Sequence, residues 1–413
     1  MEELPSRKIS SPVVQKCPKL PLLILFVSLI SATTLTFFVP LLRPTYLGRR
    51  LLPPRAARGA PPGDDTECDL FAGEWVPNPA GPYYTNDTCW AIHEHQNCMK
   101  YGRPDAGFMK WRWKPHGCEL PAFDPDRFLD VVRNKSLAFV GDSIGRNHMQ
   151  SLICLLSRVE YPIDVSTSKD ENFKQWKYTT FNFTIATFWS PFLVRAKEAD
   201  SDGPTHTGLF NLYLDEANED WTTPIEKFGF VIINAGHWFY CPGIYFENDS
   251  QIGCRYCLID NLTDLPMTYG YQKALKTAFK AINDLKKYKG VTFLRTFAPS
   301  HFEGGDWNNG GNCLRQKPLR GNEVFLEGVN LEMYLAQVEE FKVAEKEGRT
   351  KGLRFRLLDV TRAMLLRPDG HPSRYGHGPQ ENVTLYNDCV HWCLPGPIDS
   401  WSDFFLQMLK TKN

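Results

Sequence analysis

The chain has no excess of charge of either sign. Its 413 residues include 47 lysines and arginines against 47 aspartates and glutamates, so the formal net charge at pH 7 is zero. Domains that bind nucleic acid carry a basic patch that neutralises phosphates. The balance of charges therefore argues against nucleic acid, or another polyanion, as the partner.

Two further patterns are missing. No internal repeat is visible, so a repeat architecture is not expected. No cysteine and histidine cluster has metal-ligand spacing, because Cys254 and Cys257 form a CxxC pair without a second matching pair. We therefore predict no metal site, and a disulfide between these two cysteines.

One long apolar run occurs, between Lys19 and Arg43. Residues 20–42 contain no charged side chain, and a helix of this length spans a bilayer. The run is long for a signal peptide and lacks a clean cleavage pattern, which favours an uncleaved signal-anchor over a removed peptide. Basic residues flank both ends, so the flanking charge does not fix the orientation.

Cysteines and N-x-Ser/Thr sequons indicate on which side of the membrane the main part lies. Eleven of the twelve cysteines follow the apolar run. Six sequons also follow it, at Asn86, Asn134, Asn182, Asn248, Asn261 and Asn382. Disulfides and N-glycans both belong to the secretory lumen. We therefore predict a single-pass type II membrane protein with a lumenal main part, in which the odd number of cysteines leaves at least one unpaired within the chain.

Composition divides the chain into five parts. We expect a cytosolic tail at 1–19, the transmembrane signal-anchor at 20–42, and a flexible stem rich in proline and arginine at 43–66. A small cysteine-rich module at 67–121 follows, too short for a large core and expected to be joined by disulfides to the catalytic domain at 122–413.

Strand and helix patterns alternate in this last part. Apolar strands are predicted at 136–142, 228–235, 291–297 and 355–360, and helices at 144–157, 269–288 and 330–347. Such alternation is typical of an α/β fold with a parallel sheet between flanking helices, whose sites lie beyond the carboxyl ends of the strands.

A Gly-Asp-Ser sequence stands where the first of these strands gives way to a helix. Gly141 permits a tight turn before Asp142 and Ser143, and the amides of a helix start can stabilise an oxyanion. A serine at a helix start is by itself more often only an N-cap. The motif alone leaves both interpretations open.

Near the end of the chain Asp388 and His391 are three residues apart, close enough for the carboxylate to orient the ring. Alone, such a pair is more often a surface hydrogen bond. Here Cys389 and Cys393 can lock the loop and Trp392 can bury it, and a catalytic base requires rigid placement. If the fold brings the pair to the serine, they form a Ser-His-Asp centre for acyl transfer.

Other residues are candidates for supporting roles. Arg146 lies one helical turn beyond Ser143 and can face the same cleft, either for the oxyanion or for a structural ion pair. Asn234 ends an apolar strand, as an oxyanion donor or a turn former. His237 and His301 are the competing bases.

The chain is rich in aromatic residues, with 11 tryptophans. Aromatic rings stack on the apolar faces of sugars, but they equally fill cores. The candidates for a sugar platform are Trp111, Trp113, Trp238 and Trp392.

The chain resembles the plant trichome-birefringence-like family, the O-acetyltransferases of cell-wall polysaccharides. The resemblance covers nearly everything from Cys68 to the C-terminus. It is carried by Trp111-Arg112-Trp113, the Gly-Asp-Ser block, Asn234-Ala235-Gly236-His237-Trp238, Arg295-Thr296-Phe297-Ala298-Pro299-Ser300-His301-Phe302, and Asp388-Cys389-Val390-His391-Trp392-Cys393-Leu394-Pro395-Gly396.

The resemblance implies a fold similar to SGNH/GDSL esterases. It makes Ser143 the nucleophile, His391 the base and acid, and Asp388 its orienting partner, with Arg146 and Asn234 on the oxyanion side. The cysteines expected to form disulfides are Cys68, Cys89, Cys98, Cys118, Cys154, Cys313, Cys389 and Cys393.

The expected function is O-acetylation of a hemicellulose in the Golgi membrane. The stretch 245–257 is similar to the subgroup linked to xyloglucan and mannan, with xyloglucan the preferred acceptor and mannan the second choice. The same residues also fit an acetyl esterase with this triad, or a non-catalytic protein that binds wall glycans. No acetyl-CoA motif is recognisable, so we expect no tightly bound cofactor and a donor that is acetyl-CoA or another acetyl carrier. Golgi glycan-synthesis proteins are expected partners beside the polysaccharide and the membrane.

Overall fold

The computed structural model describes residues 68–199, 208–257, 259, 261–378 and 386–411. The expected tail, anchor and stem, and the sequon at Asn382, lie outside these residues. Within the described part, no helix is long and apolar enough to cross a membrane.

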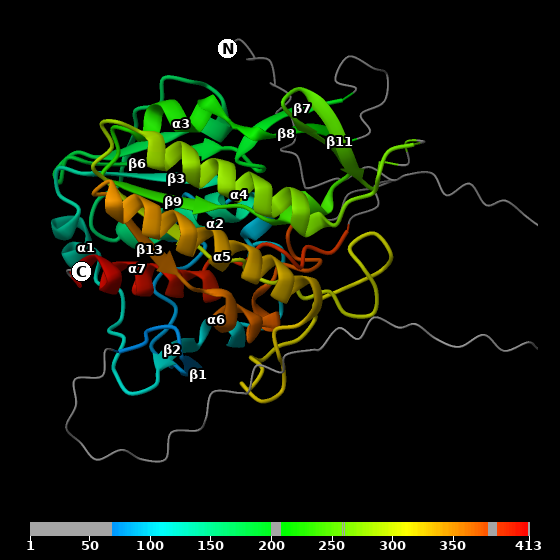
Figure 1. Ribbon diagram of the computed structural model, residues 1–413. Coiled ribbons are helices and arrows are strands. Elements are labelled where there is room, and N and C mark those ends of the chain that lie inside the picture. Colours follow the sequence, from blue (N-terminus) through cyan, green and yellow to red (C-terminus); the bar gives the residue numbers. More distant parts are fainter. Residues whose placement is uncertain (1–67, 200–207, 258, 260, 379–385, 412–413) are drawn as a thin grey trace, which may run out of the picture. The chain divides into compact units, whose positions relative to one another are not determined.

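A seven-stranded sheet forms the centre of the catalytic domain (Figure 1). In spatial order its strands are β13 (Arg354–Leu358), β12 (Val291–Arg295), β9 (Phe230–Asn234), β3 (Ser136–Gly141), β6 (Phe183–Trp189), β5 (Gln175–Tyr178) and β4 (Ile163–Asp164). The first five are parallel, while β5 and β4 complete one edge as antiparallel strands. The four predicted strands are confirmed and lie side by side.

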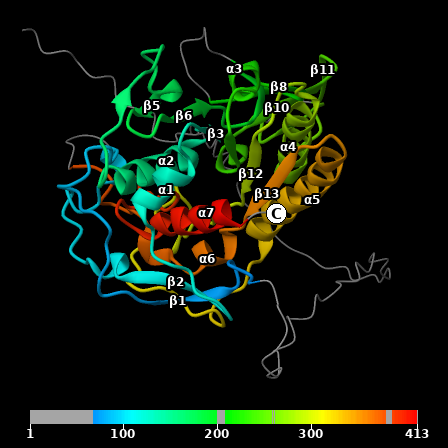
Figure 2. The same cartoon turned by 90° about the vertical axis from the view of Figure 1, so that its left-hand side faces the viewer.

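Helices cover both faces of this sheet, because its central strands alternate two sets of apolar side chains. Leu137 and Phe139 of β3 join the core on one face, and Ala138 and Val140 join the core on the other. Figure 2 shows the first face with α1 (Pro125–Val131), α2 (Ser143–Leu156) and α7 (Ser400–Lys410). The second face carries α3 (Glu219–Ile225), α4 (Met267–Asp284) and α5 (Gly328–Thr350).

The three predicted helices correspond to α2, α4 and α5, while α1, α3, α6 (Thr361–Leu365) and α7 were not predicted. A second sheet was also not predicted. Its order is β11 (Ser250–Arg255), β10 (Gly243–Glu247), β8 (Phe210–Ala217) and β7 (Val194–Glu198).

The cysteine-rich module contains one antiparallel ribbon, β1 (Gly73–Pro77) and β2 (Trp111–Pro115). Trp75 and Trp113 meet edge to face across it, with ring centroids 5.7 Å apart. Both rings belong to the same core as α2 and α7. The module therefore shares the core of the catalytic domain.

Five disulfides hold the described chain. They are Cys68–Cys118, Cys89–Cys154, Cys98–Cys393, Cys254–Cys257 and Cys313–Cys389. The second and third join the module to the catalytic domain, as expected, and the fourth occupies the CxxC pair. None of the described cysteines is free, so the predicted unpaired cysteine is not found among them.

Candidate active site

The serine turn is shaped by close packing at the carboxyl end of β3. The backbone of Gly141 has φ 142°, and a Cβ there would lie 1.4 Å from the carbonyl oxygen of Asn234, so a glycine is required. Asp142 caps α2, because its Oδ1 accepts from the amide of Ile144 at 3.0 Å. Ser143, the first residue of α2, is 8% exposed.

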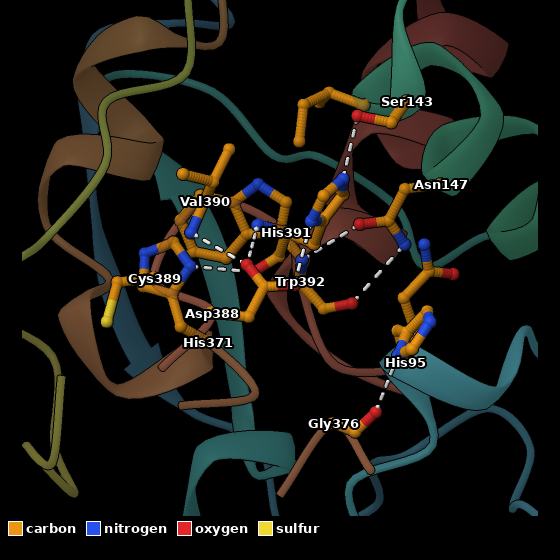
Figure 3. A network of polar contacts seen from close by, with 12 residues as sticks. His95, Ser143, Asn147, His371, Gly376, Asp388, Cys389, Val390, His391 and Trp392 are labelled. Atoms are coloured by element: carbon orange, nitrogen blue, oxygen red, sulfur yellow. Dashed lines mark hydrogen bonds and ion pairs between the residues drawn. The ribbon is translucent and has the colours of Figure 1, made fainter. Parts of the chain in front are cut away.

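The structure brings the two distant motifs together (Figure 3). His391 Nε2 lies 2.7 Å from Ser143 Oγ, and His391 Nδ1 lies 2.8 Å from Asp388 Oδ2. The other oxygen of Asp388 accepts from the amides of His391, at 2.9 Å, and Val390, at 3.1 Å. The carboxylate therefore fixes the ring and the backbone of the loop at once.

The charge state of Asp388 determines the tautomer of His391. Burial by itself raises the pKa of this carboxyl, but the positive form of His391 and its hydrogen bonds outweigh burial and hold the pKa below its usual range. An ionised Asp388 only accepts, so Nδ1 of the neutral ring carries the proton. Nε2 then offers its lone pair to the hydroxyl of Ser143, as a general base requires.

Asn147, which was not assigned a role from the sequence, joins the two motifs. Its Oδ1 accepts from the amide of Trp392 at 2.8 Å, and its Nδ2 donates to the carbonyl of Trp392 at 3.3 Å. It stands four residues after Ser143, on the same face of α2. The helix that carries the nucleophile thus also holds the loop that carries the base.

Two disulfides flank this loop. Cys389 is bonded to Cys313, and Cys393 to Cys98 of the cysteine-rich module. The loop is locked at both sides of His391, as its cysteines predicted.

The prediction for Asn234 as an oxyanion donor is wrong in its geometry. The side chain is fully buried, its Nδ2 donates to the carbonyl of Val140 at 2.9 Å, and its Oδ1 accepts from Arg295 at 3.2 Å. A Cβ on Gly145 would lie 2.2 Å from Asn234 Nδ2. Asn234 therefore supports α2 from below instead of facing the cleft.

Arg146 lies on α2, three residues after Ser143, and its predicted role beside the oxyanion stays a prediction. Its guanidinium lies 5.3 Å from the ring centroid of Trp189, and Nη1 donates to Asn172 at 3.3 Å. Burial lowers its pKa, and nearby Glu171 and Asp142 oppose this. Its Nε is buried and hydrogen-bonded to no described group.

The four tryptophan candidates for a sugar platform differ in their exposure. Trp113 and Trp392 are 1% and 0% exposed, so they present no face to a sugar and that prediction is wrong for both. Their rings pack on Trp75 and His371 instead. Trp111 and Trp238 are half-buried.

Trp189 was missed by the sequence analysis. It pairs with Gly141 across β6 and β3, next to the serine turn, and its half-buried ring meets Trp238 edge to face at 5.6 Å. The signal that could have found Trp189 is its position as the last residue of β6, the strand that pairs with β3. That signal was missing because β6 itself was not predicted.

The competing histidines do not bind the serine. His237 is buried against Phe297, with ring centroids 4.6 Å apart, and burial lowers its pKa to about 3. His301 contacts His371 and the carbonyl of Leu365. Within the described ranges, no group of three or more histidine, cysteine or acidic side chains is placed to hold a metal ion.

Four sequon asparagines, Asn134, Asn182, Asn248 and Asn261, are exposed or half-buried at positive-φ turns, and Asn86 is half-buried. Oligosaccharide is attached at such surface turns. The positions of these sequons are compatible with the predicted glycosylation, which stays a prediction.

A serine, a histidine and an aspartate in one hydrogen-bonded series are the arrangement found in serine-type acyl-transfer enzymes and esterases. Residues 120–408 match the GDSL/SGNH-like acyl-esterase family found in Pmr5 and Cas1p, and residues 66–119 match the PMR5 N-terminal domain.

Similar proteins identify the family more narrowly. The chain is 64% identical over 345 residues to protein trichome birefringence-like 19 of Arabidopsis thaliana, covering 83% of this chain and 81% of that protein. It is 58% identical over 349 residues to protein trichome birefringence-like 20 of the same plant, covering 84% and 73%. It is 44% identical over 351 residues to xyloglucan O-acetyltransferase 4 of Populus trichocarpa, covering 85% and 83%. The chain belongs to the trichome birefringence-like family, which confirms the resemblance seen in its motifs.

Proposed function

We propose that the protein is an O-acetyltransferase that transfers acetyl groups to hydroxyls of a hemicellulose, xyloglucan above all, through an acetyl-serine at Ser143. The observation that carries this proposal is the continuous hydrogen-bonded series from Ser143 Oγ through His391 to Asp388. Xyloglucan O-acetyltransferases of poplar and Arabidopsis, 42–44% identical to this chain, support the acceptor.

In the first half-reaction His391 Nε2 removes the proton of Ser143, and Oγ attacks the acetyl carbonyl of the donor. The C–O bond to serine forms, and the leaving group departs with the proton that His391 returns. The donor is acetyl-CoA or another acetyl carrier.

The oxyanion of this step has two candidate donors. The first amides of a helix have no acceptor within the helix. Asp142 takes the amide of Ile144 with its side chain and those of Gly145 and Arg146 with its carbonyl. The amide of Ser143 itself is thus left for the oxyanion, and the guanidinium of Arg146, three residues further along the helix, is the second candidate.

In the second half-reaction a sugar hydroxyl gives its proton to His391 and attacks the acetyl-serine. The bond to Oγ breaks, His391 protonates the serine, and the O-acetyl glycan leaves. Water is the competing acceptor, so transfer requires that the glycan fill the site. The low exposure of Ser143, 8%, favours this outcome.

The proposal includes a cellular location, which the sequence supports. The apolar run at 20–42, the sequons and the disulfides support a single-pass type II protein of the Golgi membrane with a lumenal catalytic domain. Golgi glycan-synthesis proteins would then supply its polysaccharide.

An acetyl esterase is the second candidate, because the matched family is described as an acyl-esterase family. The test is to give the detergent-solubilised full chain a labelled acetyl donor with xyloglucan, mannan or xylan oligosaccharides. Labelled xyloglucan oligosaccharide, absent with Ser143→Ala, supports the proposal. Release of free acetate from acetylated glycans without any transfer would replace it by the esterase. Glycan binding with neither reaction would leave a binding protein.

A further inference from the structure

A buried histidine, His371, and a half-buried one, His301, lie behind the catalytic loop in one series of contacts. His371 Nδ1 is 2.7 Å from the carbonyl oxygen of His391, and His371 Nε2 is 2.7 Å from His301 Nδ1. His301 Nε2 is in turn 3.0 Å from the carbonyl oxygen of Leu365. The ring of His371 also stacks on Trp392, the neighbour of the base, at 4.1 Å between centroids.

The chemistry of the partners assigns the protons. Burial lowers the pKa of His371, so its ring is neutral and carries one proton. The contact of its Nδ1 ends on the carbonyl oxygen of His391, which only accepts. His371 therefore carries its proton on Nδ1 and donates to His391, and its Nε2 is an acceptor that faces His301 Nδ1.

The cysteine-rich module holds this arrangement from the other side. Arg103 donates from Nη1 to the carbonyl of His371 at 2.9 Å and from Nη2 to the carbonyl of Asp369 at 2.6 Å. Its Nη1 also lies 3.3 Å from the sulfur of Cys393. Arg103 is 6% exposed and forms an ion pair with Asp105 at 3.0 Å. This ion pair fixes the guanidinium independently of its contacts with the loop.

We propose that His371 is a positioning residue for the catalytic base. Its Nδ1–H holds the carbonyl of His391 and its ring supports Trp392. Arg103 of the module and His301 fix His371 in place. The cysteine-rich module thereby contributes to catalysis through Arg103. This inference rests on the proposed role of His391 as the base.

Three variants separate positioning from simple packing. In His371→Asn the amide nitrogen stands where Nδ1 stood and still donates to His391. In His371→Gln the amide nitrogen stands where Nε2 stood, so the bond to His391 is lost. His371→Leu keeps bulk against Trp392 but has no donor. His148→Leu is the matched control, because His148 is also buried between aromatic rings, Phe139 and Trp401, but its ring is hydrogen-bonded to no described group.

The measurements are kcat and acceptor KM in the full chain, and the rate at which a fluorophosphonate probe labels Ser143. We expect His371→Leu and His371→Gln to lower kcat and the labelling rate about 10- to 100-fold, with acceptor KM within about twofold. His371→Asn and His148→Leu are expected to stay within about fivefold of the parent chain. Melting curves show which variants are folded. The comparison of His371→Asn with His371→Gln decides the inference, and it requires only that these two variants fold.

The inference is overturned if Asn and Gln behave alike, or if the loss appears in KM alone. Failure of the proposed function is a separate result. A parent chain that is labelled at Ser143 but acetylates no glycan contradicts the transferase, while the labelling rates still decide the role of His371. A parent chain that is not labelled at Ser143 overturns both.

Discussion

The two oxygens of Asp388 have different roles at the site. Oδ2 receives the Nδ1 proton of His391, and Oδ1 receives two backbone amides of the same loop. An ionised carboxylate satisfies all three donors, because it is an acceptor at both oxygens. An amide at this position satisfies only two of them.

Asp388→Asn is therefore expected to keep the loop in place but reverse the tautomer of His391. With its oxygen on the backbone amides, the new NH2 group faces Nδ1 and forces the ring proton onto Nε2, where no lone pair remains for Ser143. We expect kcat to fall about 100- to 10,000-fold with little change in melting temperature. Acetyl transfer assayed from pH 6 to 9 checks this, and a loss under tenfold would contradict the assigned tautomer.

At this scale the sequence predicted the reacting groups but not their supports. Ser143, Asp388 and His391 stand in motifs whose spacing already suggests their contacts. Asn147 and His371 were not recognised, because polar residues that contact backbone across the fold leave no local pattern. Trp113 and Trp392 were misassigned, since a tryptophan beside a site residue has the same local sequence whether it is buried or exposed.

At the scale of elements, continuous apolar runs predicted the central strands. All residues of β9 and β12 are buried, so both are mostly apolar in sequence, with a polar residue only at Thr292 and at the last positions, Asn234 and Arg295. Strand β8 of the second sheet, Phe210–Ala217, is largely half-exposed and has polar residues near its end, so its sequence alone does not indicate a strand buried by pairing with its neighbours. Helix α2 was predicted, but its close approach to Asn234 was not.

Gly145→Ala tests that approach. The added methyl group would lie 2.2 Å from Asn234 Nδ2, a buried group held by Val140, so α2 must move away from β9. We expect a loss of about 1–3 kcal/mol in the free energy of unfolding, measured in urea.

The double variant Gly145→Ala/Asn234→Ala provides the control. Removing the Asn234 side chain makes room for the methyl group, so the two losses are expected to be less than additive. Full additivity would show that the two residues do not meet.

At the scale of the whole molecule, the contact between module and catalytic domain contains two buried acids. Asp399 accepts from Tyr84 at 2.7 Å and Ser151 at 2.5 Å, and Asp403 accepts from Tyr83 at 2.8 Å. Burial raises the pKa of Asp399 to about 6 and that of Asp403 to about 8. Both acids therefore favour the folded state most when protonated.

Buried histidines act in the opposite direction. Burial lowers the pKa of His93, His148, His237 and His301 to about 4, 3, 3 and 4. As the pH falls below about 6.5, these histidines bind protons in the unfolded chain but stay neutral in the folded chain. The free energy of unfolding therefore falls. Above about pH 6.5 these histidines are neutral in both states and no longer change the free energy of unfolding.

Together, the buried acids and the histidines predict that the free energy of unfolding is greatest near pH 6.5 and declines toward pH 8. In that range folded Asp403 keeps a proton that the unfolded chain has already lost, so the free energy of unfolding falls by at most about 1.4 kcal/mol per pH unit as the pH rises. Asp403→Asn keeps the acceptor for Tyr83 and removes the titration, so its urea stability is expected to be flat from pH 6.5 to 8. An unchanged slope in the variant would assign the decline to other groups.

The bond between Cys98 and Cys393 is expected to matter more for function than its counterpart at Cys254–Cys257. Replacing Cys98 and Cys393 by serine is expected to lower the free energy of unfolding by about 2–5 kcal/mol and to lower kcat, because the loop of His391 loses one of its fixed ends. The Cys254→Ser/Cys257→Ser variant is the control, with a loop of sequence separation 3. Equal effects of the two pairs on kcat would contradict this.

The sequence separation of 295 between Cys98 and Cys393 also sets the order in which activity can arise during synthesis. A growing chain contains its nucleophile long before its base has been synthesised, and the partner of Cys98 is made 295 residues after it. Chains that stop before His391 therefore have a nucleophile without its base. Chains in which Cys98 and Cys393 stay reduced are expected to react more slowly than oxidised ones.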